Sequence, residues 1–113
     1  MRIRNITKNT CLAEEAVMAQ ALFKRMKGLL GQGGLKQGQA MVLKPCNSIH
    51  TFFMAFAIDV LFLDKENRVV KALDNVSPFR ISGIYLKAQS AIELPAGTIQ
   101  ATSTSPGDVL LLE

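Results

Sequence analysis

The stretch FAIDVLFL, residues 56–63, decides the fold of this chain. Seven of its eight side chains are apolar, and side chains alternate between the two faces of a β-strand. A strand here therefore places apolar groups on both faces, which is typical of a central strand in a covered sheet. The exception is Asp59, in the middle of the run. The segment predicts a central strand with one carboxylate in its interior.

The next residues predict a hairpin. Residues 64–67, DKEN, form a polar turn in which Asn67 suits a left-handed backbone, and residues 68–73 return as the partner of residues 60–63. The sequence SPGD has Pro and Gly where a type II turn requires them. The remaining predicted strands are residues 2–7, 40–43, 49–54, 87–94 and 109–112.

One amphipathic helix is predicted over residues 19–30, where apolar side chains recur at helical spacing and glycines follow. Residues 11–18 leave two alternatives open, the start of that helix with Thr10 as its cap or a returning hairpin strand. We predict a mainly β (β-rich α+β) domain. It is a compact antiparallel sandwich or small barrel with one helix near residues 19–30 and a short helical turn near residues 96–101.

Length and composition favour one globular domain over residues 1–113. A chain of 113 residues with 49% apolar residues can bury a single core. The net charge is +4, and the first 46 residues hold eight Lys or Arg and two Glu. Because these cations are dispersed and no aromatic-basic motif accompanies them, we do not expect nucleic-acid binding.

Cysteine usage and hydropathy bear on the compartment. Cys11 and Cys46 form no CxxC pattern, and the N-terminus lacks the apolar core of a signal peptide. The longest uncharged run, residues 45–58, is too short to span a bilayer. We expect a soluble, reduced, cytoplasmic protein without a transmembrane segment. Cys46 and His50 could form half a zinc site, but a second ligand pair is missing, so we expect no metal and no other cofactor.

The candidate site gathers around Asp59. A buried carboxylate needs partners, and the candidates are His50, Arg80 or backbone N–H groups of a neighbouring loop. We predict a small polar pocket formed by His50, Thr51, Asp59 and Arg80. Glu93 stands between two apolar residues of a predicted strand and is expected to face solvent at a sheet edge.

Two functions fit these residues. The leading hypothesis is a non-catalytic binding or accessory domain whose polar pocket takes a small ligand or a partner protein. The alternative is a small hydrolase or isomerase that uses His50 as acid and base, with Asp59 orienting it. The sequence names neither the ligand nor the partner, and it does not define the oligomeric state.

An ordered set of motifs resembles the family called "domain of unknown function 192", a family of small prokaryotic proteins. The likeness runs from about residue 13 to the end of the chain. It implies a compact, mostly β domain and implies that residues 11–18 form a strand. It implies no activity, so no catalytic residue is carried over. The motifs are GLLG at 28–31, IHTFFM at 49–54, IDVLFLD at 58–64, ELPAG at 93–97 and GD at 107–108.

Overall fold

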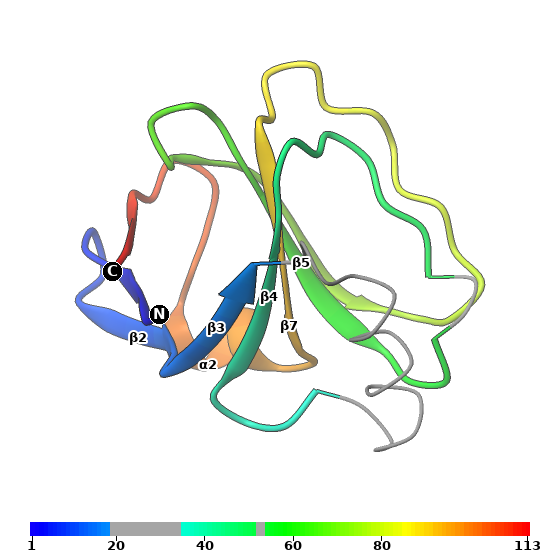
Figure 1. Cartoon of the computed structure of the whole chain (residues 1–113), viewed down its shortest axis with the longest axis horizontal. Coiled ribbons are helices and arrows are strands. Elements are labelled where there is room, and N and C mark those ends of the chain that lie inside the picture. Colours follow the sequence, from blue (N-terminus) through cyan, green and yellow to red (C-terminus); the bar gives the residue numbers. More distant parts are fainter. Residues whose placement is uncertain (19–34, 52–53) are drawn as a thin grey trace.

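The computed structural model describes residues 1–18, 35–51 and 54–113, and these residues form two β-sheets with one short helix. The larger sheet has the strand order β3-β4-β7-β5-β6, and the smaller one has the order β2-β1-β8 (Figure 1). In chain order the elements are β1 (Ile3–Asn5), β2 (Thr10–Ala13), β3 (Glu15–Met18), β4 (Gln39–Leu43), β5 (Ile58–Leu63), β6 (Val69–Val76), β7 (Ser90–Pro95), α2 (Thr98–Thr102) and β8 (Leu110–Leu112).

Strand β5 lies inside the larger sheet, as its sequence predicts. It pairs antiparallel with β6 on one side and β7 on the other, and all six of its side chains are buried. The hairpin to β6 turns at Asn67, whose φ of 60° is in the left-handed region. The predictions of a central strand and of the hairpin are confirmed.

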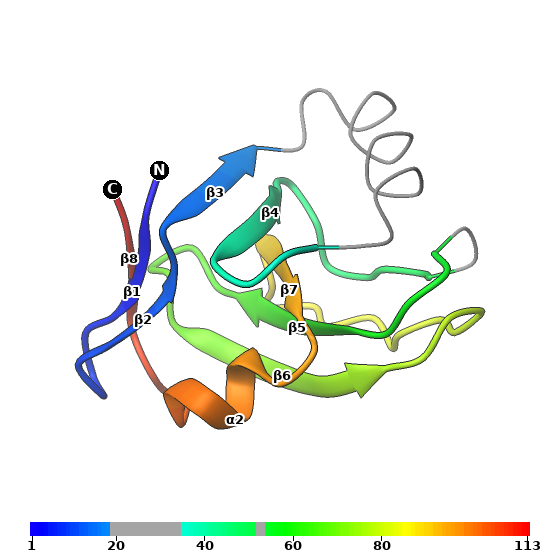
Figure 2. The same ribbon diagram turned by 90° about the horizontal axis from the view of Figure 1, so that it is seen from below.

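The two faces of β5 contribute to two separate apolar clusters. Leu61 and Leu63 pack into the main core, between the larger sheet, the smaller sheet and α2. Ile58, Val60 and Phe62 pack on the opposite face, beneath loops. Each fully buried aliphatic side chain of this kind contributes roughly 1.5–3 kcal/mol. Figure 2 shows the smaller sheet and α2 on one side of the larger sheet, a sandwich-like arrangement.

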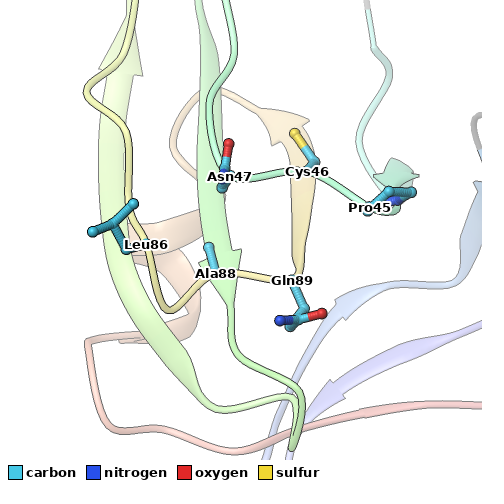
Figure 3. A pocket seen from close by; sticks show the side chains of 6 residues that line it. All are labelled: Pro45, Cys46, Asn47, Leu86, Ala88 and Gln89. Carbon is cyan, nitrogen blue, oxygen red and sulfur yellow. The ribbon is translucent and has the colours of Figure 1, made fainter.

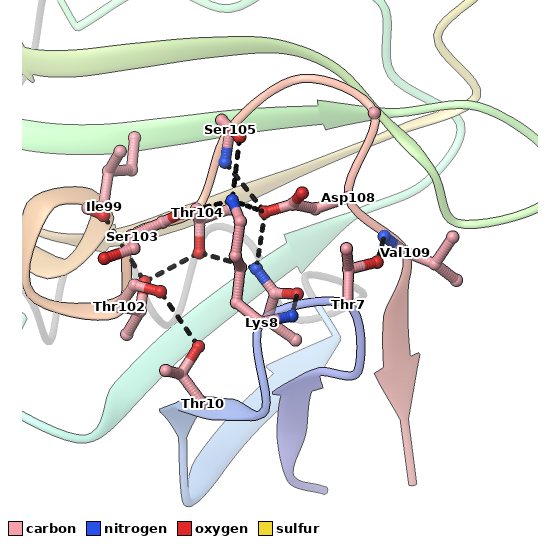
Figure 4. Close-up of polar contacts among 12 residues, drawn as sticks. Thr7, Lys8, Thr10, Ile99, Thr102, Ser103, Thr104, Ser105, Asp108 and Val109 are labelled. Carbon is pink, nitrogen blue, oxygen red and sulfur yellow. Dashed lines mark hydrogen bonds and ion pairs between the residues drawn. The ribbon is translucent and has the colours of Figure 1, made fainter.

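A buried polar network joins the first and last segments of the chain (Figure 4). Asn5 Nδ2 donates to Asp108 Oδ2 at 2.9 Å and to Thr104 Oγ1 at 3.1 Å, and Lys8 Nζ lies 3.0 Å from the same Asp108 oxygen. Burial alone would raise the pKa of Asp108, but the hydrogen bonds from Asn5 and Lys8 outweigh it and lower this pKa. The network is structural, because its hydrogen bonds join the first segment of the chain to the last.

Several sequence expectations can be compared with this fold. The predicted helical turn is present as α2, and the turn at residues 105–108 has its glycine at φ 96°. Residues 11–18 belong to β2 and β3, as the family resemblance implies. The predicted helix over residues 19–30 lies outside the described residues.

The predicted mainly β, sandwich-like domain is confirmed. Its strand pairs are antiparallel except at one edge of the larger sheet, where β3 runs parallel to β4. Residues 49–54 were predicted to form a strand, but this was wrong: their described part, residues 49–51 and 54, makes one isolated bridge, between His50 and Ile81. Residues 49–51 do not join the sheet. Their backbone groups bond to the loop at residues 79–82.

Candidate functional site

Asp59 is fully buried, and both of its carboxylate oxygens accept backbone N–H groups. Oδ1 accepts from Asn75 at 2.9 Å, while Oδ2 accepts from Gly97 at 3.1 Å and from Ile99 at 2.8 Å. Of the partners considered from the sequence, backbone amides of neighbouring loops are therefore the ones it uses. Asp59 fixes the end of β6 and the start of α2 against β5.

The side chain of Asp59 points away from the other predicted site residues. It shares its face of β5 with Leu61 and Leu63, which pack in the main core together with Ile99. Ile49, the neighbour of His50, packs in the cluster on the opposite face. The fold therefore does not bring all four predicted residues into one pocket.

His50, Thr51 and Arg80 do come together, on a pair of loops that run side by side (Figure 1). We call this pair, residues 47–51 and 79–86, the loop arm. Its backbone is held by hydrogen bonds from Tyr85 N to Asn47 O at 3.0 Å and from Ser82 N to Ile49 O at 2.9 Å. The loop arm lies at the end of the molecule away from both chain termini (Figures 1 and 2).

Thr51 organises the loop arm from within. Its side chain is fully buried, and Oγ1 donates to Ser77 O at 2.7 Å while accepting from Arg80 N at 3.0 Å. Its backbone N donates to Arg80 O at 2.9 Å. His50 and Arg80, by contrast, are both exposed. Thr51 thus fixes the backbone from which the imidazole and the guanidinium reach solvent.

The loop arm also exposes large apolar side chains. The four most exposed large hydrophobic residues in the described part of the chain all lie on it: Leu86 at 86%, Phe79 at 73%, and Ile81 and Ile84 at 68% each. Phe79 has a φ of 62°, a left-handed conformation that costs an aromatic residue about 1–2 kcal/mol. Phe79, Ile81, Ile84 and Leu86 are therefore held outward on a backbone that is itself hydrogen-bonded.

A shallow hollow lies at the base of the loop arm (Figure 3). Its volume is about 420 Å³, within the range of small-ligand sites. Leu86 belongs to both features, so the exposed apolar surface continues into the hollow. The lining residues are Pro45, Cys46, Asn47, Leu86, Ala88 and Gln89.

Glu93 is buried, so the expectation of a solvent-facing edge residue was wrong. It is only 6% exposed, because β7 lies inside the sheet and pairs Glu93 with Met41 on β4 and Val60 on β5. Burial raises the pKa of Glu93 to about 7. A carboxyl group in this position changes its charge near neutral pH.

The two cysteines are free thiols. Burial raises the pKa of Cys46, and its Sγ donates to Ser48 O at 3.1 Å. Within residues 1–18, 35–51 and 54–113, no three His, Cys, Asp or Glu side chains gather in a position to hold a metal ion. None of the helices described is long and apolar enough to cross a membrane.

The fold and its surface define a two-sheet β domain with an exposed loop pair at one end. The model of the DUF192 family, described as "Uncharacterized ACR", matches residues 3–112. This chain belongs to the DUF192 family. The resemblance noted in the sequence is thus confirmed.

The chain is also similar to proteins of the UPF0127 group. A Pyrococcus horikoshii member is 35% identical over 112 residues, which cover 94% of each chain. A Thermococcus sibiricus member is 32% identical over 108 residues, covering 92% of this chain and 70% of the relative. These relatives support the family and add no activity.

Two solved structures share the fold. A protein of unknown function from Novosphingobium aromaticivorans superposes with a TM-score of 0.76 at 16% identity, covering 98% of this chain and 82% of that one. A Sinorhizobium meliloti protein gives 0.75 at 19% identity, covering 97% and 89%. At this identity the likeness concerns the fold alone.

Sequence reasoning found His50, Thr51 and Arg80 but missed the apolar part of the loop arm. The signal was present in FRISGIYL, residues 79–86, which alternates large apolar residues with Arg80, Ser82 and Gly83. Such a pattern reads equally well as a buried strand, and the exposure of each side chain becomes visible only in the fold.

Proposed function

We propose that this chain is a non-catalytic binding domain and that the loop arm is its binding surface for a partner protein. His50 and Arg80 supply polar contacts at that surface, and Thr51 holds the backbone that presents them. Asp59 contributes indirectly. Its hydrogen bonds fix the end of β6 and the start of α2 against β5.

The observation that carries the proposal is the exposure of Phe79, Ile81, Ile84 and Leu86 within eight consecutive residues. Leaving apolar area in water costs roughly 25 cal/mol for each Å². Isolated exposed apolar residues are ordinary on protein surfaces, but a contiguous group of large ones is typical of an interaction surface. A partner that covers these side chains recovers that free energy.

The acid–base alternative is less well supported. It requires Asp59 to orient the His50 imidazole, but the oxygens of Asp59 accept three backbone N–H groups on the other face of β5. The geometry therefore favours binding over hydrolysis or isomerisation. A reduced, cytoplasmic setting remains part of this proposal, in keeping with the free thiols of Cys11 and Cys46.

A paired co-purification tests the proposal. Wild-type protein and an arm variant, Ile81→Ser with Leu86→Ser, are expressed at equal levels in the native cell, and the bound proteins are quantified. The control is Leu111→Ser, which changes a 40% exposed leucine on β8 in the smaller sheet.

We expect a protein recovered in near-stoichiometric amount with the wild type and the control, and lost with the arm variant. Equal recovery by all three proteins, or no enriched protein with the wild type, contradicts a partner-binding role for the loop arm. A broad metabolite screen by thermal shift then asks whether a small molecule uses the hollow instead.

A further inference from the structure

The segments that form and flank the loop arm carry charge of one sign. Residues 44–51 and 77–89 contain Lys44, Arg80 and Lys87, and no Asp or Glu. Lys44, Arg80 and Lys87 are all exposed. Every Asp and Glu lies outside these two segments, so the exposed charges that the segments carry are positive.

The hollow supplies a place for one anchoring side chain. At about 420 Å³ it exceeds the volume of any single side chain, and it is bordered by apolar Leu86, Pro45 and Ala88. Asn47 and Gln89 on its wall offer hydrogen-bonding groups to the backbone of a bound segment. In Figure 3 these residues come from two separate loops that lie next to each other.

From these features we infer that the loop arm binds an acidic, apolar segment of a partner polypeptide. The segment places a large apolar side chain against Leu86 and the hollow, and its carboxylates near Arg80 and Lys87. Charge complementarity of this kind sets the choice of partner and the rate of association more than the final affinity. This inference rests on the binding function proposed above and names the chemistry of the partner.

An anionic membrane surface fits the charges less well. Each Lys or Arg near such a surface contributes about 1 kcal/mol, and clusters of roughly 4–8 are typical of lipid recognition. Among the described residues, the segments 44–51 and 77–89 offer three, Lys44, Arg80 and Lys87. Binding to a flat bilayer surface would also leave the hollow between the two loops unfilled.

A second copy of this chain fits less well too. A two-fold symmetric contact through the loop arms would bring the same basic residues of both copies together. Like charges facing one another across an interface disfavour it. The net charge of +4 on each copy adds to the repulsion.

Selection from a library of random short peptides tests the inference directly. Wild-type protein is the bait, and enriched peptides are synthesised and measured by fluorescence anisotropy at low and high salt. Two variants probe the site, Leu86→Ser for the apolar contact and Arg80→Ala with Lys87→Ala for the charges. The matched controls are Leu111→Ser and Lys65→Ala with Lys71→Ala, which alter exposed groups on other elements.

The expected peptides combine Asp or Glu with large apolar residues. Each probing variant should bind these peptides about tenfold more weakly or worse, which corresponds to roughly 1.4 kcal/mol of binding free energy, whereas the controls bind as the wild type does. High salt should weaken wild-type binding and leave the charge variant nearly unaffected.

Other outcomes overturn the inference. A selection without enriched peptides, peptides lacking acidic residues, or equal binding by the charge variant would each reject it. If the wild type sediments with vesicles of phosphatidylcholine and phosphatidylglycerol and the two probing variants do not, the surface belongs to a membrane. If the wild type is a dimer that Leu86→Ser converts to a monomer, the surface belongs to a second copy. If co-purification succeeds while the peptides fail, the binding function stands and only the acidic partner is rejected.

Discussion

Thr51 and Arg80 hold each other through reciprocal hydrogen bonds. The backbone N of Thr51 donates to Arg80 O at 2.9 Å, and the backbone N of Arg80 donates to Thr51 Oγ1 at 3.0 Å. The two residues are 29 positions apart in the chain. This contact ties together the two halves of the loop arm, so it determines how the guanidinium of Arg80 and the neighbouring apolar groups are presented.

Thr51→Val should destabilise the loop arm. Valine keeps the shape of threonine but leaves the partly buried Arg80 N–H and Ser77 C=O without the Oγ1 partner, at a cost of roughly 1–3 kcal/mol. Urea unfolding measures this change, and hydrogen exchange should show faster exchange of the Arg80 amide. Thr7→Val is the matched control, because exposed Thr7 accepts one hydrogen bond, from Val109 N. A Thr51 variant as stable as the Thr7 variant would contradict this role.

Asp59→Asn should lower the free energy of unfolding by about 2–4 kcal/mol. The amide removes the negative charge and turns an NH2 group toward at least one backbone N–H that Asp59 now accepts. Asp64→Asn serves as comparison, since half-buried Asp64 accepts from Glu66 N and Arg68 N in a turn. We expect Asp64→Asn to lower the free energy of unfolding by less than Asp59→Asn does in the same urea titration. Equal losses would show that burial of Asp59 is not what makes its hydrogen bonds costly to break.

Glu93 should make stability depend on pH. Burial raises the pKa of Glu93 from 4.5 to about 7, so the folded protein keeps a proton that the unfolded chain releases. The contribution of the protonated group is complete below pH 4.5 and is lost as the pH rises through about 7. As the pH rises from 4.5 to about 7, the free energy of unfolding of Glu93→Gln should increase by roughly 3 kcal/mol relative to that of the wild type. Chemical unfolding at several pH values measures this, with Glu66→Gln, in an exposed turn, as the control. A constant difference between Glu93→Gln and wild type at every pH would reject a raised pKa.

Ile81→Ser and Leu86→Ser should leave the fold intact. Their side chains are largely in water already, so each substitution should change the free energy of unfolding by less than about 0.5 kcal/mol. By contrast Leu61→Ser, on β5 in the main core, should prevent stable folding. Thermal unfolding compares the three. A large loss from Ile81→Ser would mean that the loop arm supports the fold and is not free for a partner.

The central architecture could be predicted because it follows from local patterns. Apart from Asp59, residues 58–63 are apolar on both faces of the strand, so only a covered central strand can bury them. Asn67 and Gly107 stand where turns need a positive φ, and both adopt it. The position of Asp59 predicted a carboxylate that must be bonded in the interior, and the amides of Asn75, Gly97 and Ile99 satisfy it.

The rest depends on contacts between distant segments. Residues 49–54 are rich in the aromatic and branched side chains that are typical of a strand, but the backbone partners of residues 49–51 lie in the loop at 79–82 and not in the sheet. Glu93 looks like an edge residue because it stands between apolar Ile92 and Leu94, and only the strand order places β7 between β4 and β5. Strand order is a property of the whole chain, so no window of sequence around Glu93 contains it.

The measurement that addresses the binding role most directly is site-specific photo-crosslinking in the native cell. A photoreactive amino acid replaces Ile81 on the loop arm or, as control, Lys65 in the exposed turn after β5. We predict discrete adducts of higher mass from position 81, suppressed by Leu86→Ser in the same chain, and none from position 65. Adducts of equal yield at both positions, or none at position 81, would show that the loop arm meets no partner.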